Sequence, residues 1–89
     1  MIKTKITVKG TVQGVGFRYF CRSLANQYTL FGYVKNLHNG DVEIEVEGGK
    51  NSVNTFINLV KDGPVHSKVT AISVEFFEYE KTYSSFSVY

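Results

Sequence analysis

The sequence contains few of the residues that staple secreted domains or bind metals. It has one cysteine, Cys21, which excludes an internal disulfide and therefore a disulfide-stapled secreted scaffold. Its two histidines and that cysteine do not stand at the spacing of metal ligands, so a structural zinc site is not expected. We therefore expect neither a bound metal nor a cofactor.

Long apolar runs are also missing. No segment approaches the ~20 apolar residues of a membrane span. The first ten residues alternate polar and apolar side chains instead of forming the apolar block of a signal peptide. We expect a cytoplasmic protein that makes no membrane contact. With 89 residues, 43% of them hydrophobic, the chain is expected to form one small domain over residues 1–89.

Carboxylates are absent from the first 37 residues, although the formal net charge of the whole chain is only +2. That stretch contains six lysines and arginines, whereas residues 38–89 contain four lysines and eight acidic residues. The uneven distribution predicts a local basic region that suits a small anion.

Hydrophobic periodicity predicts a strand, a helix, two strands, a helix, a strand and a short terminal strand. The predicted strands are residues 2–9, 31–37, 41–47, 69–79 and 86–89. Apolar residues at helical spacing from Phe17 to Tyr28 predict the first helix, with Cys21 as an inert core residue. The second helix is expected to start after an N-cap at Asn51 or Ser52 and to end at Gly63-Pro64.

This βαββαβ order is that of the split βαβ, or ferredoxin-like, arrangement. It predicts an α+β fold in which an antiparallel sheet of four to five strands carries both helices on one face. If the third strand lies between the first two, the first two share an edge at their C-terminal ends. That edge would bring together the Gly10–Gly16 loop, the start of the first helix and the turn near His38–Gly40.

The hairpin between the second and third strands has two plausible registers. A two-residue turn would place Lys35 opposite the core-facing Ile44. A three-residue loop, His38–Gly40, with its last residue in a left-handed conformation, would place Lys35 opposite Glu43 on the solvent side. We favour the second register because it buries no charge. It also directs Asn36 toward the helix-covered face, near the glycine loop.

The outer face of the third strand is predicted to be acidic and exposed. Its outward residues are Asp41, Glu43, Glu45 and Glu47. RNA-recognition modules share the βαββαβ order but stack bases on aromatic residues of their central strands. The third strand has no aromatic residue, and four carboxylates would repel a phosphate backbone. We therefore expect no nucleic acid partner.

The loop from Thr11 leads directly into the first helix and contains Gly14 and Gly16. Two glycines allow successive N–H groups to converge on an anion, and the helix N-terminus adds positive potential. Arg18 adds a planar guanidinium that binds phosphate oxygens in pairs. Tyr19 stands where a dinucleotide-binding fingerprint requires a third glycine, and no Gly-Lys-Ser/Thr sequence is present. From these residues alone, a structural turn with a solvated arginine remains the alternative.

Two stretches resemble the signatures of the acylphosphatase family. The first is VKGTVQGVGFR, residues 8–18, and the second is GYVKN, residues 32–36, followed by Gly40, Val42 and Gly48. Their order and spacing also match, so the resemblance covers essentially the whole chain. It implies hydrolysis of a carboxyl-phosphate anhydride to a carboxylate and inorganic phosphate, without a metal.

The resemblance also implies a set of site residues. Arg18 and Asn36 would be catalytic, with Asn36 orienting the attacking water and Arg18 holding the phosphoryl oxygens. The phosphate-binding group would be Gln13, Gly14, Val15, Gly16, Phe17 and Arg18. Gln13 either contacts the ligand or braces the loop. A phosphate oxygen of the substrate is expected to take the proton of the water, and His38 is the alternative base.

The expected partners are a small acyl phosphate substrate and inorganic phosphate or a similar anion, bound by a monomer. A non-catalytic module that binds such anions is the second candidate function. Similar domains also occur at the start of larger maturation proteins that use carbamoyl phosphate.

Overall fold

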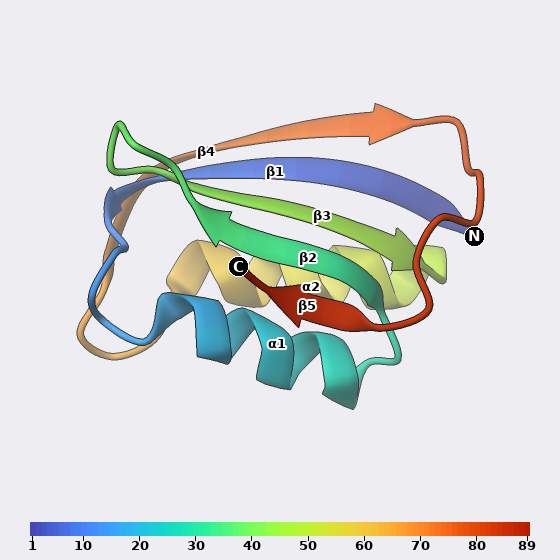
Figure 1. Cartoon of the computed structure of the whole chain (residues 1–89), viewed down its shortest axis with the longest axis horizontal. Coiled ribbons are helices and arrows are strands. Elements are labelled where there is room, and N and C mark those ends of the chain that lie inside the picture. Colours follow the sequence, from blue (N-terminus) through green and yellow to red (C-terminus); the bar gives the residue numbers. More distant parts are fainter.

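The structure, a computed structural model, describes every residue from Met1 to Tyr89. Its elements are β1 (Ile2–Thr11), α1 (Phe17–Gln27), β2 (Phe31–Asn36), β3 (Val42–Gly48), α2 (Lys50–Asp62), β4 (Lys68–Phe77) and β5 (Phe86–Val88). The strands form one open sheet in the order β4-β1-β3-β2-β5, and both helices lie against one face of it (Figure 1). The predicted α+β, ferredoxin-like fold is confirmed. Neither helix has the length and apolar character needed to cross a membrane.

The central strand β3 pairs antiparallel with both β1 and β2. These two strands therefore run in the same direction, and their C-terminal ends share the left-hand edge in Figure 1. The β2–β3 hairpin has the predicted register, with Lys35 opposite Glu43 and Asn36 opposite Val42. Gly40, with φ of 97°, adopts the conformation that its three-residue loop requires.

The sheet is mixed, not wholly antiparallel, because β5 pairs parallel with β2. After β4 the chain passes the opposite end of the sheet and returns along β2 (Figure 1). Backbone hydrogen bonds from Gly32 N to Ser85 O and from Tyr89 N to Val34 O, both 2.9 Å, hold the returning segment. This path brings Tyr89 to the edge where the glycine loop lies.

The core lies between the sheet and the two helices. Phe17, Cys21 and Ala25 of α1 are buried, as the apolar spacing predicted. Burial raises the pKa of the Cys21 thiol to about 12, so the thiol stays protonated at neutral pH. Cys21 is thus a core residue and not a nucleophile.

The start of α2 differs from the prediction. The helix begins at Lys50 with Gly49 as its N-cap, and no side chain forms a cap hydrogen bond. Asn51 and Ser52 therefore lie inside the helix. β3 ends at Gly48, and only Gly49 separates it from α2. The helix therefore begins earlier than the predicted capping residues indicated.

Of the four carboxylates predicted to be exposed, two are buried: Asp41, which directly precedes β3, and Glu47 on β3. Asp41 is covered by Lys9, whose Nζ lies 2.6 Å from its Oδ2. Glu47 is 1% exposed because the returning segment covers it, and its Oε1 accepts hydrogen bonds from Thr82 N at 3.0 Å and Tyr83 N at 2.8 Å. Both contacts join residues more than 30 positions apart, which strand alternation does not reveal.

Candidate active site

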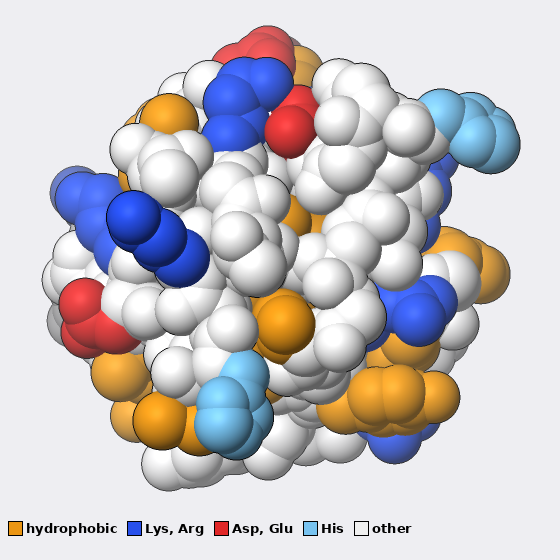
Figure 2. Space-filling model, turned by 90° about the vertical axis from the view of Figure 1, so that its left-hand side faces the viewer, with side chains coloured by type: hydrophobic (Ala, Val, Ile, Leu, Met, Phe, Trp, Pro, Cys, Tyr) orange, Lys and Arg blue, Asp and Glu red, His pale blue; other side chains and the backbone are white.

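A cavity of about 70 Å³ opens at the shared edge, where β1 leads through the glycine loop into α1 and where β2 ends. Its lining residues are Val12, Gly14, Gly16, Phe17, Arg18, Tyr19 and Asn36. The structure thus brings together the two residues predicted to be catalytic. Viewed onto this edge, backbone and uncharged polar side chains with some hydrophobic atoms occupy the centre, and basic, acidic, histidine and hydrophobic side chains lie around them (Figure 2).

The loop depends on glycine for its backbone conformation. Gly14 and Gly16 have φ of 74° and 78°, in the left-handed region. A Cβ at either position would meet no atom within 4 Å, so the requirement is conformational and not one of space. Gly16 is the N-cap of α1, and no side chain caps this helix and no acidic residue lies in its first turn. The first N–H groups of α1 are therefore free to donate to an anion.

Arg18 is the second residue of α1, and its half-buried side chain lines the cavity. Its Nη1 donates a hydrogen bond of 2.7 Å to the main-chain oxygen of Tyr89. This single contact fixes one side of the guanidinium and leaves its other N–H groups free to bind a ligand. β5 therefore positions the arginine, a contact that the sequence did not indicate.

Asn36 is the last residue of β2 and reaches the cavity from the opposite side. Its Oδ1 is buried and has no hydrogen-bond partner in the protein. A buried acceptor without a partner costs free energy, so native proteins rarely leave one unless a ligand or water bonds to it. Asn36 thus places an amide with an unsatisfied acceptor next to the cavity.

The structure places some of the other predicted phosphate-binding residues in the cavity lining and others outside it. Gln13 Nε2 donates to the carbonyl oxygens of Leu37 at 2.8 Å and Asp41 at 2.9 Å, so its side chain braces the hairpin. Val15 packs against the core and does not line the cavity. Val12 and Tyr19, by contrast, line it without having been predicted. The sequence could have indicated Tyr19 as a lining residue, because Tyr19 directly follows Arg18.

The lysines of residues 1–37 are all paired with carboxylates and are therefore not free to attract an anion. Each pairs with a carboxylate of β3 or its hairpin: Lys3 with Glu45, Lys5 and Lys35 with Glu43, each at 3.3 Å, and Lys9 with Asp41 at 2.6 Å. The ion pair predicted between Lys35 and Glu43 is confirmed. These ion pairs neutralise much of the charge of the carboxylates on and next to β3, and Arg18 and Arg22 are the basic residues among residues 1–37 that pair with no Asp or Glu side chain.

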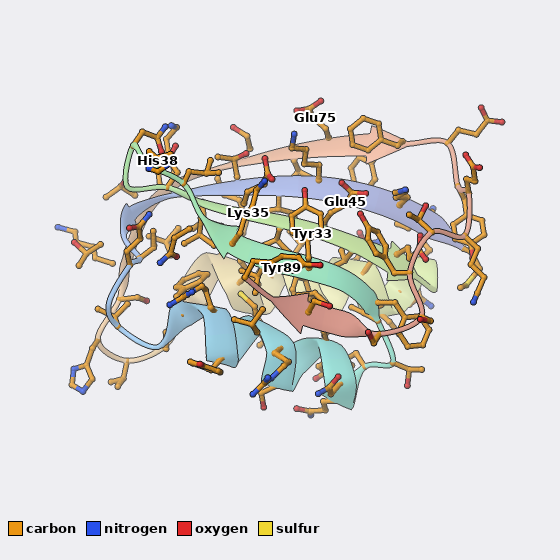
Figure 3. All side chains as sticks on the ribbon, in the orientation of Figure 1. Tyr33, Lys35, His38, Glu45, Glu75 and Tyr89 are labelled. Carbon is orange, nitrogen blue, oxygen red and sulfur yellow. The ribbon has the colours of Figure 1, made fainter.

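His38 lies at the exposed tip of the β2–β3 hairpin and does not line the cavity (Figure 3). This position does not favour it as the alternative base. The cavity contains no carboxylate or histidine in its lining. Its chemistry is that of backbone N–H groups, one arginine and one amide, which together bind and orient an anion and a water molecule.

Comparison with known proteins finds relatives in both sequence and fold. The acylphosphatase family model covers residues 4–88. An acylphosphatase of Bacillus subtilis is 50% identical over 74 residues, which cover 83% of this chain and 81% of the relative. The crystal structure of acylphosphatase from Bacillus subtilis superposes with a TM-score of 0.97, at 44% identity, over 100% of this chain and 99% of that one.

A longer protein contains a similar unit. Full-length HypF, crystallised in its phosphate- and nucleotide-bound form, matches with a TM-score of 0.87 and 34% identity. The match covers 99% of this chain and 12% of HypF. Because the family model and the relatives match along nearly the entire sequence, this chain belongs to the acylphosphatase family.

Proposed function

We propose that this protein hydrolyses small acyl phosphates to a carboxylate and inorganic phosphate, with the phosphoryl group bound in the 70 Å³ cavity. One observation carries the assignment of roles: Asn36, whose buried Oδ1 has no hydrogen-bond partner in the protein, lines the same cavity as Arg18 and the start of α1. A water acceptor thus lies beside an anion site, as hydrolysis of a phosphoryl group requires.

Arg18 and the free N–H groups at the start of α1 bind the phosphoryl oxygens in this proposal. Phosphoryl transfer depends mainly on positioning and on stabilising the charge of the three equatorial oxygens. The contact with Tyr89 holds the guanidinium in place before substrate arrives. Because the site is preorganised, little free energy is lost in reorganising it during the reaction.

Asn36 orients the attacking water by accepting one of its hydrogen bonds at Oδ1. The water oxygen forms a bond to phosphorus while the bond between phosphorus and the acyl oxygen breaks, and the electron pair leaves on the carboxylate. An amide is not a base, so the water proton moves to a phosphoryl oxygen of the substrate. A carboxylate is a good leaving group, so no protein acid or base is required.

Turnover of benzoyl phosphate in the presence of a metal chelator tests the function. We expect hydrolysis to continue with the chelator present, and inorganic phosphate to inhibit competitively because it occupies the same cavity. Arg18→Ala should lower kcat by about 10³–10⁵, as expected for an arginine that stabilises a transferring phosphoryl group. A folded protein that binds phosphate but turns over no acyl phosphate would instead support the anion-binding module.

The role of Asn36 has its own test. Asn36→Ala should lower kcat by about 10²–10³, the typical effect of removing one preorganised polar group, while phosphate affinity changes little. Asn58→Ala, which removes an exposed asparagine of α2, is the matched control and should retain wild-type kinetics. Near-normal turnover in folded Asn36→Ala would contradict the proposed role in orienting water.

A further inference from the structure

The groups that the proposed function assigns to the phosphoryl group and the attacking water, namely Arg18, Asn36 and the start of α1, line the cavity. If the phosphoryl group occupies it, as the proposed function requires, the acyl group must lie at the mouth of the cavity.

Tyr19 is the large residue of the cavity lining that is also exposed to solvent. It lines the cavity and is nevertheless 59% exposed, whereas the other aromatic residue in the lining, Phe17, is 1% exposed and part of the core. An exposed aromatic ring beside the cavity offers an apolar surface to the acyl group, which lies outside the cavity. The helix fixes this placement because Tyr19 directly follows Arg18 in the first turn of α1.

Arg22 holds this ring. Its guanidinium carbon lies 5.1 Å from the centroid of the Tyr19 ring, a cation–π distance, and the residues are three positions apart on α1. Arg22 pairs with no carboxylate that would draw it away. The contact favours the tyrosine rotamer in which the ring lies against Arg22.

From these observations we propose that Tyr19 determines acyl-group specificity. Its ring contacts the acyl group of the bound substrate and favours planar aromatic acyl groups over small aliphatic ones. Aromatic pairs gain stabilisation beyond the apolar area that they bury, which corresponds to roughly a tenfold preference in affinity. Arg22 is a positioning residue that acts through Tyr19. The inference rests on the proposed acyl phosphate hydrolysis.

The measurement is the ratio of kcat/KM for benzoyl phosphate to kcat/KM for acetyl phosphate. Tyr19→Ala should lower this ratio about tenfold, chiefly by raising KM for benzoyl phosphate, because the contact is made to bound substrate as well as to the transition state. Tyr19→Phe keeps the ring and should retain most of the preference. Arg22→Gln should give an intermediate ratio, since it releases the ring without removing it.

The control is Tyr79→Ala, which removes a tyrosine that follows β4 and lies outside the cavity lining. It should leave the ratio unchanged. An unchanged ratio in Tyr19→Ala would overturn the proposal, and so would an equal loss with both substrates, which would indicate a general effect on the site. A wild-type protein that hydrolyses neither substrate would contradict the proposed function itself, so the two failures are distinguishable.

Discussion

Asn36 and Thr4 each bury a side-chain oxygen that has no hydrogen-bond partner in the protein. The physical cost is similar in both cases, but the surroundings differ. Asn36 lines the cavity, where the proposed function gives its amide an attacking water as partner. Thr4 is fully buried on the core-facing side of β1, in line with Ile6 and Val8, and has no such use. A buried polar atom without a hydrogen-bond partner thus indicates a functional site only where it lies next to a cavity.

The unpartnered hydroxyl of Thr4 gives a stability prediction. Thr4→Val replaces it with a methyl group of similar size and should stabilise the protein by about 1 kcal/mol, because the cost of desolvating the hydroxyl is removed. For a domain of this length that corresponds to a rise in Tm of about 4–8 °C, measured by thermal unfolding. Thr70→Val at an exposed position of β4 is the control and should change stability by less than about 0.5 kcal/mol. A lower Tm in Thr4→Val would show that the hydroxyl is stabilising.

At the scale of elements, the two helices start in the same way but for different reasons. Each has a glycine N-cap and no side-chain cap. Gly16 adopts a left-handed conformation that L-residues rarely adopt, and it leaves the N–H groups of α1 open to an anion. Gly49 has φ of −62° and ψ of 141°, an extended conformation open to any residue, and a Cβ there would meet nothing within 4 Å.

This contrast predicts opposite effects of one substitution. Gly49→Asp should stabilise the protein by about 0.5–1 kcal/mol, because it adds a cap, complements the helix dipole and restricts the unfolded chain. Gly16→Asp should destabilise it, owing to the strain at positive φ, and should abolish phosphate binding by placing a negative charge at the anion site. Chemical denaturation and phosphate titration measure the two effects. Destabilisation by Gly49→Asp would contradict the assignment of Gly49 as a freely replaceable cap.

At the scale of the whole molecule, the sheet face opposite the helices carries a cluster of lysine–carboxylate ion pairs, and Figure 3 labels Lys35 and Glu45 among their members. Glu43 is its centre: it pairs with Lys5 and Lys35 and accepts a 2.9 Å hydrogen bond from the Tyr33 hydroxyl. Burial raises the pKa of Glu43, but the hydrogen bonds from these three residues outweigh it and leave the pKa below its ordinary value. Burial and the hydrogen bond to Glu43 raise the pKa of Tyr33.

The lowered pKa of Glu43 predicts how stability changes in acid. The unfolded chain binds the proton more tightly than the folded one, so this carboxylate stabilises the fold above its unfolded pKa of about 4.3. That contribution is lost as the pH falls through the lower pKa of the folded state. Glu43→Gln should therefore reduce the acid dependence of the free energy of unfolding below about pH 5. Glu75→Gln, which removes an exposed carboxylate without an ion pair, should leave that dependence close to wild type. An unchanged acid profile in Glu43→Gln would contradict the central role of this residue.

Local sequence patterns were sufficient to predict where much of the candidate site lies. The order of elements follows from hydrophobic periodicity, and the register that places Asn36 at the edge follows from the need to keep Lys35 out of the core. The glycine loop and Arg18 are contiguous in sequence, so their common location could be predicted. The partners of Gln13 and of Glu47 could not, because they lie 24 or more positions away along the chain.

The sequence by itself determined the strands, the helices, the hairpin and the approach of the anion loop to Asn36, because each depends on side-chain period or on neighbouring residues. Only the tertiary structure decided which charges remain unpaired. It joins the lysines of residues 1–37 to the carboxylates on and next to β3, leaves Arg18 without an Asp or Glu partner, and brings Tyr89 back along β2 to hold it. These outcomes depend on which strands become neighbours, and a charge is neutralised only by the group that folding places beside it.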